Sequence, residues 1–196
     1  MKITVPGIPD ELFRRGDVPM TKQEVRILAL VKARIGQDAT VIDIGAGTGS
    51  LAVEAALLAP AGRVYAIEKE AAGVELIRAN AANFVAANLT VIHGPAPDAL
   101  AGLPPADVIF IGGSGGQLAA VLAAADCLLK TDGRLVVTAV TVETLQQTLA
   151  WADAAGGYAS EAAGVQITRL RPLGRRHMFQ ALNQVYIIVC SKGETP

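Results

Sequence analysis

The chain of 196 residues has few of the side chains on which several classes of protein depend. Aromatic residues make up only 4% of it, which argues against a surface of stacked rings for single-stranded nucleic acid. Its 17 basic and 18 acidic residues give a net charge of −1, without the basic excess typical of DNA- and RNA-binding proteins. The sequence therefore predicts no nucleic-acid partner, although it leaves room for a local basic cluster around an acidic small molecule.

Cysteine and histidine are also scarce. The two cysteines, Cys127 and Cys190, and the two histidines, His93 and His177, do not have the spacing of metal ligands, so no metal site is expected. Both cysteines lie in apolar runs and are interpreted as small buried thiols in a reducing cytosol. The first residues hold no apolar stretch long enough for a signal peptide, and the internal apolar runs are only as long as strands. We therefore expect a cytoplasmic protein that does not bind membranes.

The length fits a single domain over residues 1–196. Residues 1–20, rich in proline, glycine and charge, are expected to lie over this domain as a segment that covers substrate and cofactor. A helix is predicted over 21–35, with Thr21 and Glu24 as its capping box and Gly36 at its end.

Short apolar strands then alternate with helical stretches. The predicted strands are 40–44, 63–68, 89–93, 106–112 and 133–140, and the predicted helices are 49–59, 70–87, 115–129 and 142–155. Strands without polar alternation are typical of a parallel sheet with helices on both faces.

The alternation ends after Gly156 and Gly157. Residues 158–173 and 181–192 are predicted as two antiparallel strands without a helix between them. The connection 174–180 is long for a turn, so we expect it to be functional or to lie at a subunit contact. The fold class predicted is α/β: a Rossmann-like, seven-stranded sheet, parallel with a terminal antiparallel strand. This plan resembles that of class I methyltransferases, whereas a nicotinamide-binding domain would continue the alternation.

The first turn of such a sheet is the usual ligand site. Here it holds Gly45, Gly47 and Gly49, which let the backbone approach a ligand. A dinucleotide fingerprint would need a glycine at the position of Ser50, and the observed spacing instead resembles methyltransferase motif I. Glu68 ends the next strand, where a carboxylate can accept hydrogen bonds from both hydroxyls of an adenosine ribose.

The third strand ends at His93 and is followed by Pro95 and Ala96. Methyltransferases often place an acidic residue in this loop to contact adenine, so adenine is expected to meet backbone and Ala96 instead. His93 is interpreted as a strand-end histidine rather than a base.

At this point the chain resembles a narrower family, the decarboxylating C15-methyltransferases that act on precorrins in cobalamin biosynthesis. The resemblance covers nearly the whole length and is carried by GIPDELFRRGDVPMTKQEVR (7–26), VIDIGAGTGSLAVEAA (41–56), IGGSGG (111–116) and FQALNQVYII (179–188). It implies S-adenosylmethionine as the cofactor, with methyl transfer to C15 and loss of carbon dioxide from the C12 acetate. The implied cofactor contacts are Thr21, Asp43, Gly45, Ala46, Gly47, Thr48, Gly49, Glu68 and Ala96.

A corrinoid substrate carries many carboxylates, which arginine binds in a bidentate manner. The candidate arginines are Arg14, Arg15, Arg169, Arg171, Arg175 and Arg176, of which we expect at least half to be ordinary exposed charges. The glycine-rich loop around Gly113, Ser114 and Gly115 offers backbone N–H groups and close approach to a flat ring. The predicted substrate contacts are Arg14, Arg15, Gly113, Ser114, Gly115 and Arg175. No catalytic residue is identified, and Asp17, Ser114 and His177 are candidates for assisting with a proton.

Several alternatives stay open at this point. A second interpretation is a methyltransferase for another small molecule, a protein or RNA, although the glycine-rich loop after the fourth strand and the balanced charge count against nucleic acid. From a different class, the chain could be a non-catalytic domain that binds the adenosyl cofactor. An oxidoreductase that uses NAD is a poorer third interpretation. The resemblance implies a homotetramer with 174–180 as a candidate contact. Met1 directly precedes the shared N-terminal motif, which favours a stand-alone enzyme, although a domain from a fusion with a C5-methylating partner would look the same. Whether the substrate carries cobalt is left open.

Overall fold

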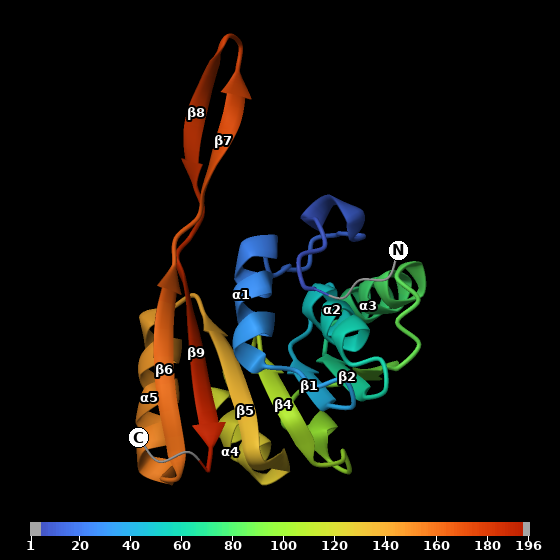
Figure 1. Ribbon diagram of the computed structural model, residues 1–196, viewed down its shortest axis with the longest axis vertical. Helices are drawn as coiled ribbons and strands as arrows, with labels where there is room; N and C mark the ends of the chain where they lie inside the picture. Colours follow the sequence, from blue (N-terminus) through green and yellow to red (C-terminus); the bar gives the residue numbers. More distant parts are fainter. Residues whose placement is uncertain (1–4, 194–196) are drawn as a thin grey trace.

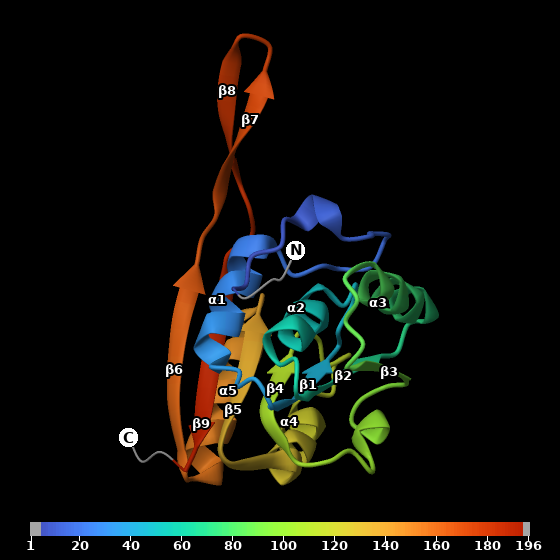
Figure 2. The same cartoon turned by 45° about the vertical axis from the view of Figure 1, so that its right-hand side comes forward.

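The computed structural model describes residues 5–193 and has an α/β fold. A seven-stranded sheet lies between two layers of helices, and a two-stranded hairpin projects from the body (Figures 1 and 2). The strands are β1 (Thr40–Ile44), β2 (Arg63–Glu68), β3 (Leu89–His93), β4 (Ala106–Ile111), β5 (Leu129–Ala139), β6 (Tyr158–Val165), β7 (Thr168–Leu173), β8 (Arg176–Ala181) and β9 (Val185–Lys192). The helices are α1 (Gln23–Ala33), α2 (Ser50–Leu58), α3 (Ala71–Asn83), α4 (Leu118–Leu128) and α5 (Val142–Ala155), with short 3₁₀ turns η1 (Asp10–Leu12) and η2 (Asp98–Leu100).

The strand order in the main sheet is β3-β2-β1-β4-β5-β9-β6. The first five strands in this order are parallel, and β9 runs antiparallel to both β5 and β6. Ile44 at the end of β1 is in register with Ile67 on β2 and Ile111 on β4, so the carboxyl ends of these strands meet at one edge. The arrangement confirms the predicted fold class.

Successive residues of each central strand point to opposite helix layers. Val41 packs among side chains of α1, α2 and α3, whereas its neighbour Ile42 packs among those of α4 and α5. Because both faces of the sheet are covered, the central strands carry apolar residues pointing to both faces rather than in alternation with polar ones. This explains the unbroken Val and Ile runs of the sequence.

The start of α1 differs from the prediction. Its N-cap is Lys22, without a side-chain cap, so the capping box of Thr21 and Glu24 does not form. The helix ends before Arg34, which takes a left-handed conformation with φ of 51°, rather than at Gly36. Both predictions were wrong. At the start of the helix, tertiary contacts engage the two capping residues: Glu24 pairs with Arg169, and the Thr21 carbonyl accepts a hydrogen bond from Arg26. At its end, the left-handed Arg34 stops the helix before Gly36 is reached.

A fully buried arginine attaches the N-terminal segment to the body. Arg26 on α1 is 0% exposed and forms ion pairs with Glu54 on α2 and with Asp10. The Glu54 carboxylate also accepts the backbone N–H groups of Gly7 and Ile8. The pKa of Asp10 lies below its usual range because, although burial raises it, hydrogen bonds from Arg26 and from the Gln23 backbone outweigh burial. One ionic cluster, Asp10–Arg26–Glu54, thus holds residues 7–10 against α1 and α2; residues 1–4 of the predicted covering segment lie outside the described residues.

The C-terminal part of the chain forms more strands than predicted. The predicted strand 158–173 is divided into β6 and β7, and the connection 174–180 largely belongs to β8. The prediction of a long connection was wrong because Gly174, with φ of 59°, and Arg175 suffice for a tight hairpin turn.

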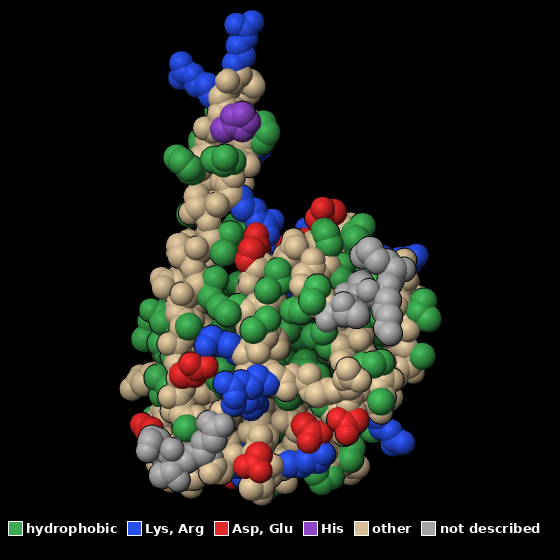
Figure 3. Space-filling model, in the orientation of Figure 1, with side chains coloured by type: hydrophobic (Ala, Val, Ile, Leu, Met, Phe, Trp, Pro, Cys, Tyr) green, Lys and Arg blue, Asp and Glu red, His purple; other side chains and the backbone are tan. Residues whose placement is uncertain are grey.

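The hairpin of β7 and β8 has two chemically different faces. Cross-strand partners share a face, so Leu170 lies beside Phe179, and these side chains are 62% and 78% exposed. The opposite face carries Arg169, Arg171 and Arg176 together with Leu173 and Met178. In Figure 3, Lys and Arg side chains extend from the hairpin tip, and hydrophobic side chains lie along its length.

The two cysteines differ in burial. Cys190 on β9 is buried, as predicted, and burial raises the pKa of its thiol to about 12. Cys127 is exposed, contrary to the prediction, because α4 buries Leu118, Val121, Leu122 and Ala125 on its other face. Over residues 5–193, no helix combines the length and the apolar character needed to cross a membrane.

Candidate functional site

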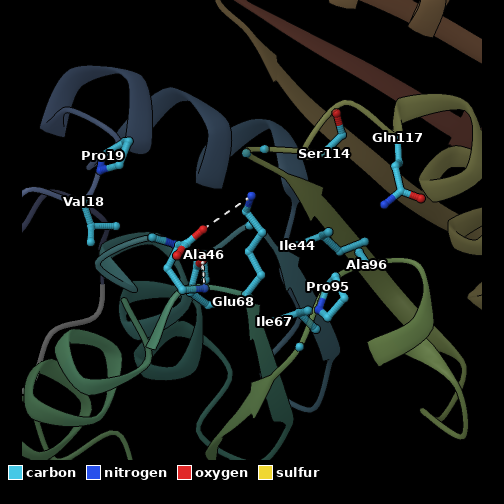
Figure 4. A pocket seen from close by; sticks show the side chains of 18 of the residues that line it. Val18, Pro19, Ile44, Ala46, Ile67, Glu68, Pro95, Ala96, Ser114 and Gln117 are labelled. Atoms are coloured by element: carbon cyan, nitrogen blue, oxygen red, sulfur yellow. Dashed lines mark hydrogen bonds and ion pairs between the residues drawn. The ribbon is translucent and has the colours of Figure 1, made fainter. Parts of the chain in front are cut away.

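A cavity of about 470 Å³ lies at the carboxyl edge of β1, β2 and β4. This volume is within the range of small-molecule sites. Five segments line it: Val18, Pro19 and Thr21; Ile44–Gly47; Ile67–Glu70; Gly94–Ala96; and Gly112–Gly115 with Gln117. In Figure 4, Val18 and Pro19 lie on one side of the cavity, Ser114 and Gln117 on the other, and Ala46 and Glu68 between them.

The glycine turn after β1 is in close contact with two other loops. Gly45, with φ of 71°, would place a Cβ atom 2.4 Å from the carbonyl oxygen of Gly113. Gly47, with φ of 58°, would place one 2.5 Å from the carbonyl oxygen of Pro19. From the sequence, these glycines are interpreted as letting the backbone approach a ligand. The structure shows that they also let the turn pack against the N-terminal segment and the loop after β4.

Glu68 is held firmly at the floor of the cavity. Its side chain is buried, and its Oε2 accepts the N–H of Gly47 at 2.8 Å while Oε1 accepts the N–H of Glu70 at 2.9 Å. Each carboxylate oxygen can accept a second hydrogen bond. Glu68 therefore both supports the glycine turn and keeps acceptor capacity for a diol.

Two polar side chains beside the turn have unsatisfied buried atoms. Oδ2 of Asp43 and Oγ1 of Thr48 have no hydrogen-bond partner within the described part of the chain. Burial, followed by the negative charge of Glu68, raises the pKa of Asp43 to about 7. Asp43 lines a small second cavity together with Thr21, Gly45 and Ala46, which also line the main one. Unsatisfied buried acceptors are costly, and a cationic ligand group nearby would offset that cost.

The wall near β3 is apolar. Ile67, Pro95 and Ala96 line it, which suits the face of an aromatic base. His93 is exposed, outside the cavity lining, with Nε2 3.1 Å from the Lys69 carbonyl oxygen. This position fits the interpretation of His93 as a strand-end histidine.

The structure brings together most of the predicted cofactor contacts. Thr21, Gly45, Ala46, Gly47, Glu68 and Ala96 line the main cavity. Asp43 is reached through the second cavity, whereas Thr48 and Gly49 lie behind the turn, both buried. Of the predicted substrate contacts, Gly113, Ser114 and Gly115 line the cavity.

The predicted arginines do not join this site within one chain. Arg14 and Arg15 are exposed outside the cavity lining, with the Arg15 Nε donating to the Asp10 carbonyl oxygen. Arg175 lies in the turn of the projecting hairpin. Arg169 is occupied by Glu24, at 2.7 Å, and by Asp10, at 3.4 Å.

The candidates for proton transfer are likewise divided. Ser114 lines the cavity, Asp17 is exposed next to Val18, and His177 lies on β8 opposite Pro172. Over residues 5–193, no three His, Cys, Asp or Glu side chains gather as a metal ion would require.

Sequence reasoning missed several lining residues. Val18 and Pro19 belong to the predicted covering segment, and their nearness to Thr21 was the available signal. Lys69, Glu70 and Gln117 directly follow or flank predicted site residues but carry no motif of their own.

Comparison with known proteins places this geometry in a family. The family model described as "Precorrin methyltransferase domain" matches residues 11–192. The cobalt-precorrin-6B C(15)-methyltransferase (decarboxylating) of Salmonella typhimurium is 42% identical over 94% of this chain and 96% of its own. The crystal structure of precorrin-6Y C5,15-methyltransferase from Geobacter metallireducens superposes with a TM-score of 0.90 at 40% identity, covering 95% of this chain and 98% of that one. The structure of precorrin 8w decarboxylase from Methanobacterium thermoautotrophicum has a TM-score of 0.86 at 33% identity, covering 93% and 98%.

Proposed function

This chain belongs to the precorrin methyltransferase family, and from that premise we propose that it methylates C15 of a precorrin or cobalt-precorrin and removes carbon dioxide from the C12 acetate. The observation that carries the proposal is the cavity in which the glycine turn meets Glu68, at the edge where this family's sequence motifs converge. The balanced net charge supports a small-molecule substrate rather than a nucleic acid. The unpaired cysteines support a cytoplasmic location.

S-adenosylmethionine is the cofactor that the site residues fit best. We propose that Glu68 accepts hydrogen bonds from the ribose hydroxyls, that Ile67, Pro95 and Ala96 pack against the adenine, and that Asp43 faces the charge of the ammonium group. The unsatisfied Oδ2 of Asp43 and the spare acceptor capacity of Glu68 support this assignment.

The protein's part in the reaction is mainly one of placement. When bound, S-adenosylmethionine supplies the methyl group. The loop of Gly113, Ser114 and Gly115 borders the same cavity and would hold the ring so that its electron-rich C15 faces that methyl group in line. In the decarboxylation, the bond between the acetate methylene and its carboxylate would break with release of carbon dioxide. The ring would take up the electron pair of that bond and return it to the methylene carbon as this carbon gains a proton and becomes a methyl group.

Cofactor binding is expected to release a proton from Asp43 at mildly acid pH. Below its pKa of about 7, the Asp43 carboxyl of the free protein is protonated, and a cation bound nearby lowers that pKa. Affinity for S-adenosylhomocysteine should therefore weaken as the pH falls through about 7, and calorimetry at about pH 6 in buffers of different ionisation enthalpy should show release approaching one proton. The Asp43→Asn variant should show no such release, and a wild-type enthalpy that is independent of buffer would contradict the assignment.

Mass spectrometry of an incubation with the precorrin substrate tests the reaction itself. The wild-type protein with S-adenosylmethionine should give a product that has gained one methyl group and lost one carbon dioxide. Glu68→Ala, purified identically, is the matched control and should lose roughly 1–3 kcal/mol of cofactor binding, because ribose hydroxyls are left unpaired. A methylated product that keeps its carboxylate would refute the decarboxylation, and an unmodified substrate would refute the whole proposal.

We further propose that the protein is a homotetramer assembled through the hairpin of β7 and β8. A two-stranded hairpin alone is only marginally stable in water, and this one exposes Leu170 and Phe179 side by side. An exposed apolar face of this kind is typical of an interaction surface. The number of copies follows the family resemblance.

A further inference from the structure

One cationic side chain at the mouth of the cavity has no role in the site described so far. Lys69 directly follows Glu68, and of the described residues that line the cavity it is the only lysine or arginine. Its side chain is 56% exposed, so its ammonium group is open to solvent at the entrance.

The Lys69 side chain extends from the end of β2 toward the glycine-rich loop. Its Nζ is 3.9 Å from the position of a Cβ atom on Gly115, and 3.4 Å from Oε1 of Glu70. Because Lys69 and Glu70 are both more than half exposed, their ion pair is weak and can be exchanged for another anion. The ammonium group therefore lies between the cofactor wall and the loop that would border the substrate.

We propose that Lys69 is a specificity-determining residue, whose ammonium group pairs with one peripheral carboxylate of the tetrapyrrole ring. This inference rests on the proposed function, because it takes the substrate to be a polycarboxylate. Within one chain, Arg14, Arg15 and Arg175 lie outside the cavity lining, so Lys69 is the cation placed to meet a carboxylate there. A flat tetrapyrrole bound above Gly113 and Gly115 would present its carboxylates at the rim of the ring, on the side where the Lys69 ammonium group lies.

The location of Lys69 favours the substrate over the cofactor as its partner. Glu68, the adjacent residue, faces inward and is fixed to Gly47, whereas Lys69 reaches outward toward Gly115. The cofactor's own carboxylate is the competing partner, and the two assignments predict different losses of affinity.

Steady-state kinetics with the precorrin substrate, together with calorimetry of S-adenosylhomocysteine binding, distinguishes a substrate partner of Lys69 from a cofactor partner. For Lys69→Gln, KM for the tetrapyrrole should rise roughly tenfold, with kcat within about twofold of wild type and the S-adenosylhomocysteine Kd unchanged. Lys69→Arg should restore most of the loss, and the wild-type KM should rise with salt concentration. Lys130→Gln is the matched control, since Lys130 is also exposed and paired with an acid, Asp107, at the opposite edge of the sheet.

Each result that contradicts these expectations shows which proposal is wrong, the role of Lys69 or the proposed function. An unchanged KM in Lys69→Gln beside an active wild type overturns the role of Lys69 and leaves the proposed function intact. A weakened S-adenosylhomocysteine Kd in Lys69→Gln with an unchanged KM assigns Lys69 to the cofactor and overturns the inference. A wild-type protein without turnover refutes the proposed function and this inference with it.

Discussion

Glu54→Ala is expected to lower the free energy of unfolding by about 3–5 kcal/mol, the usual loss when one partner of a buried ion pair is removed. Glu54 and Arg26 are 1% and 0% exposed, so the arginine would keep a buried charge with only Asp10 to balance it. The N–H groups of Gly7 and Ile8 would also lose their acceptor. Chemical denaturation of the purified protein measures the change.

Two further variants make this result interpretable. Glu161→Ala removes an acid from the exposed pair with Lys32 and should cost no more than about 1 kcal/mol. Glu54→Gln keeps an acceptor oxygen and should fall between the two alanine variants. Because the cluster holds the segment that leads to Val18, Pro19 and Thr21, folded Glu54→Gln protein should also bind S-adenosylhomocysteine more weakly. Equal, small losses in all three variants would show that the cluster contributes little.

Phe179→Glu is expected to dissociate the proposed tetramer into smaller species. Phe179 is 78% exposed in the single chain and lies beside Leu170 on the apolar face of the hairpin. A carboxylate buried there in an interface would lack a partner, and its desolvation opposes association. Sedimentation analysis of both proteins at the same concentration measures the outcome.

The neighbouring residue provides the control for this experiment. Gln180 alternates to the opposite face, beside Arg169, so Gln180→Glu adds the same charge without entering the apolar face. Gln180→Glu should leave the proposed tetramer intact. Circular dichroism should show the seven-stranded body retained in Phe179→Glu, since β7 and β8 form a separate sheet. A wild-type monomer, or a tetramer unaffected by Phe179→Glu, would contradict the proposed interface.

Most of the fold could be predicted because its signals are local. Runs such as 40–44 and 63–68 are mostly apolar, and glycines mark where the chain turns, so five strands and four helices followed from short windows. The hairpin could not be predicted in the same way, since strand-like residues continue through 158–173 without a marked break. The two strands are distinguished by their partners: β6 pairs with β9, whereas β7 pairs with β8 across the turn of Gly174 and Arg175.

The site shows the same division between local and distant information. The glycine turn and Glu68 belong to adjacent elements and were recognised from their spacing. The ion pair of Arg26 with Glu54 joins two helices, and that of Arg169 with Glu24 spans 145 residues, so neither follows from a window of sequence. A signal was nonetheless present for one partner: Glu54 is the single charged residue of the apolar stretch SLAVEAALL, which indicates that it is paired.

The closeness of Gly45 to Gly113 and of Gly47 to Pro19 bears on how such enzymes can be recombined. Three chain segments interlock there with no room for a single added carbon atom. The glycine turn after β1 therefore cannot be exchanged by itself: a chimera that replaces this turn alone would place it against foreign carbonyl groups. Successful exchanges between methyltransferases should transfer all three segments as one unit.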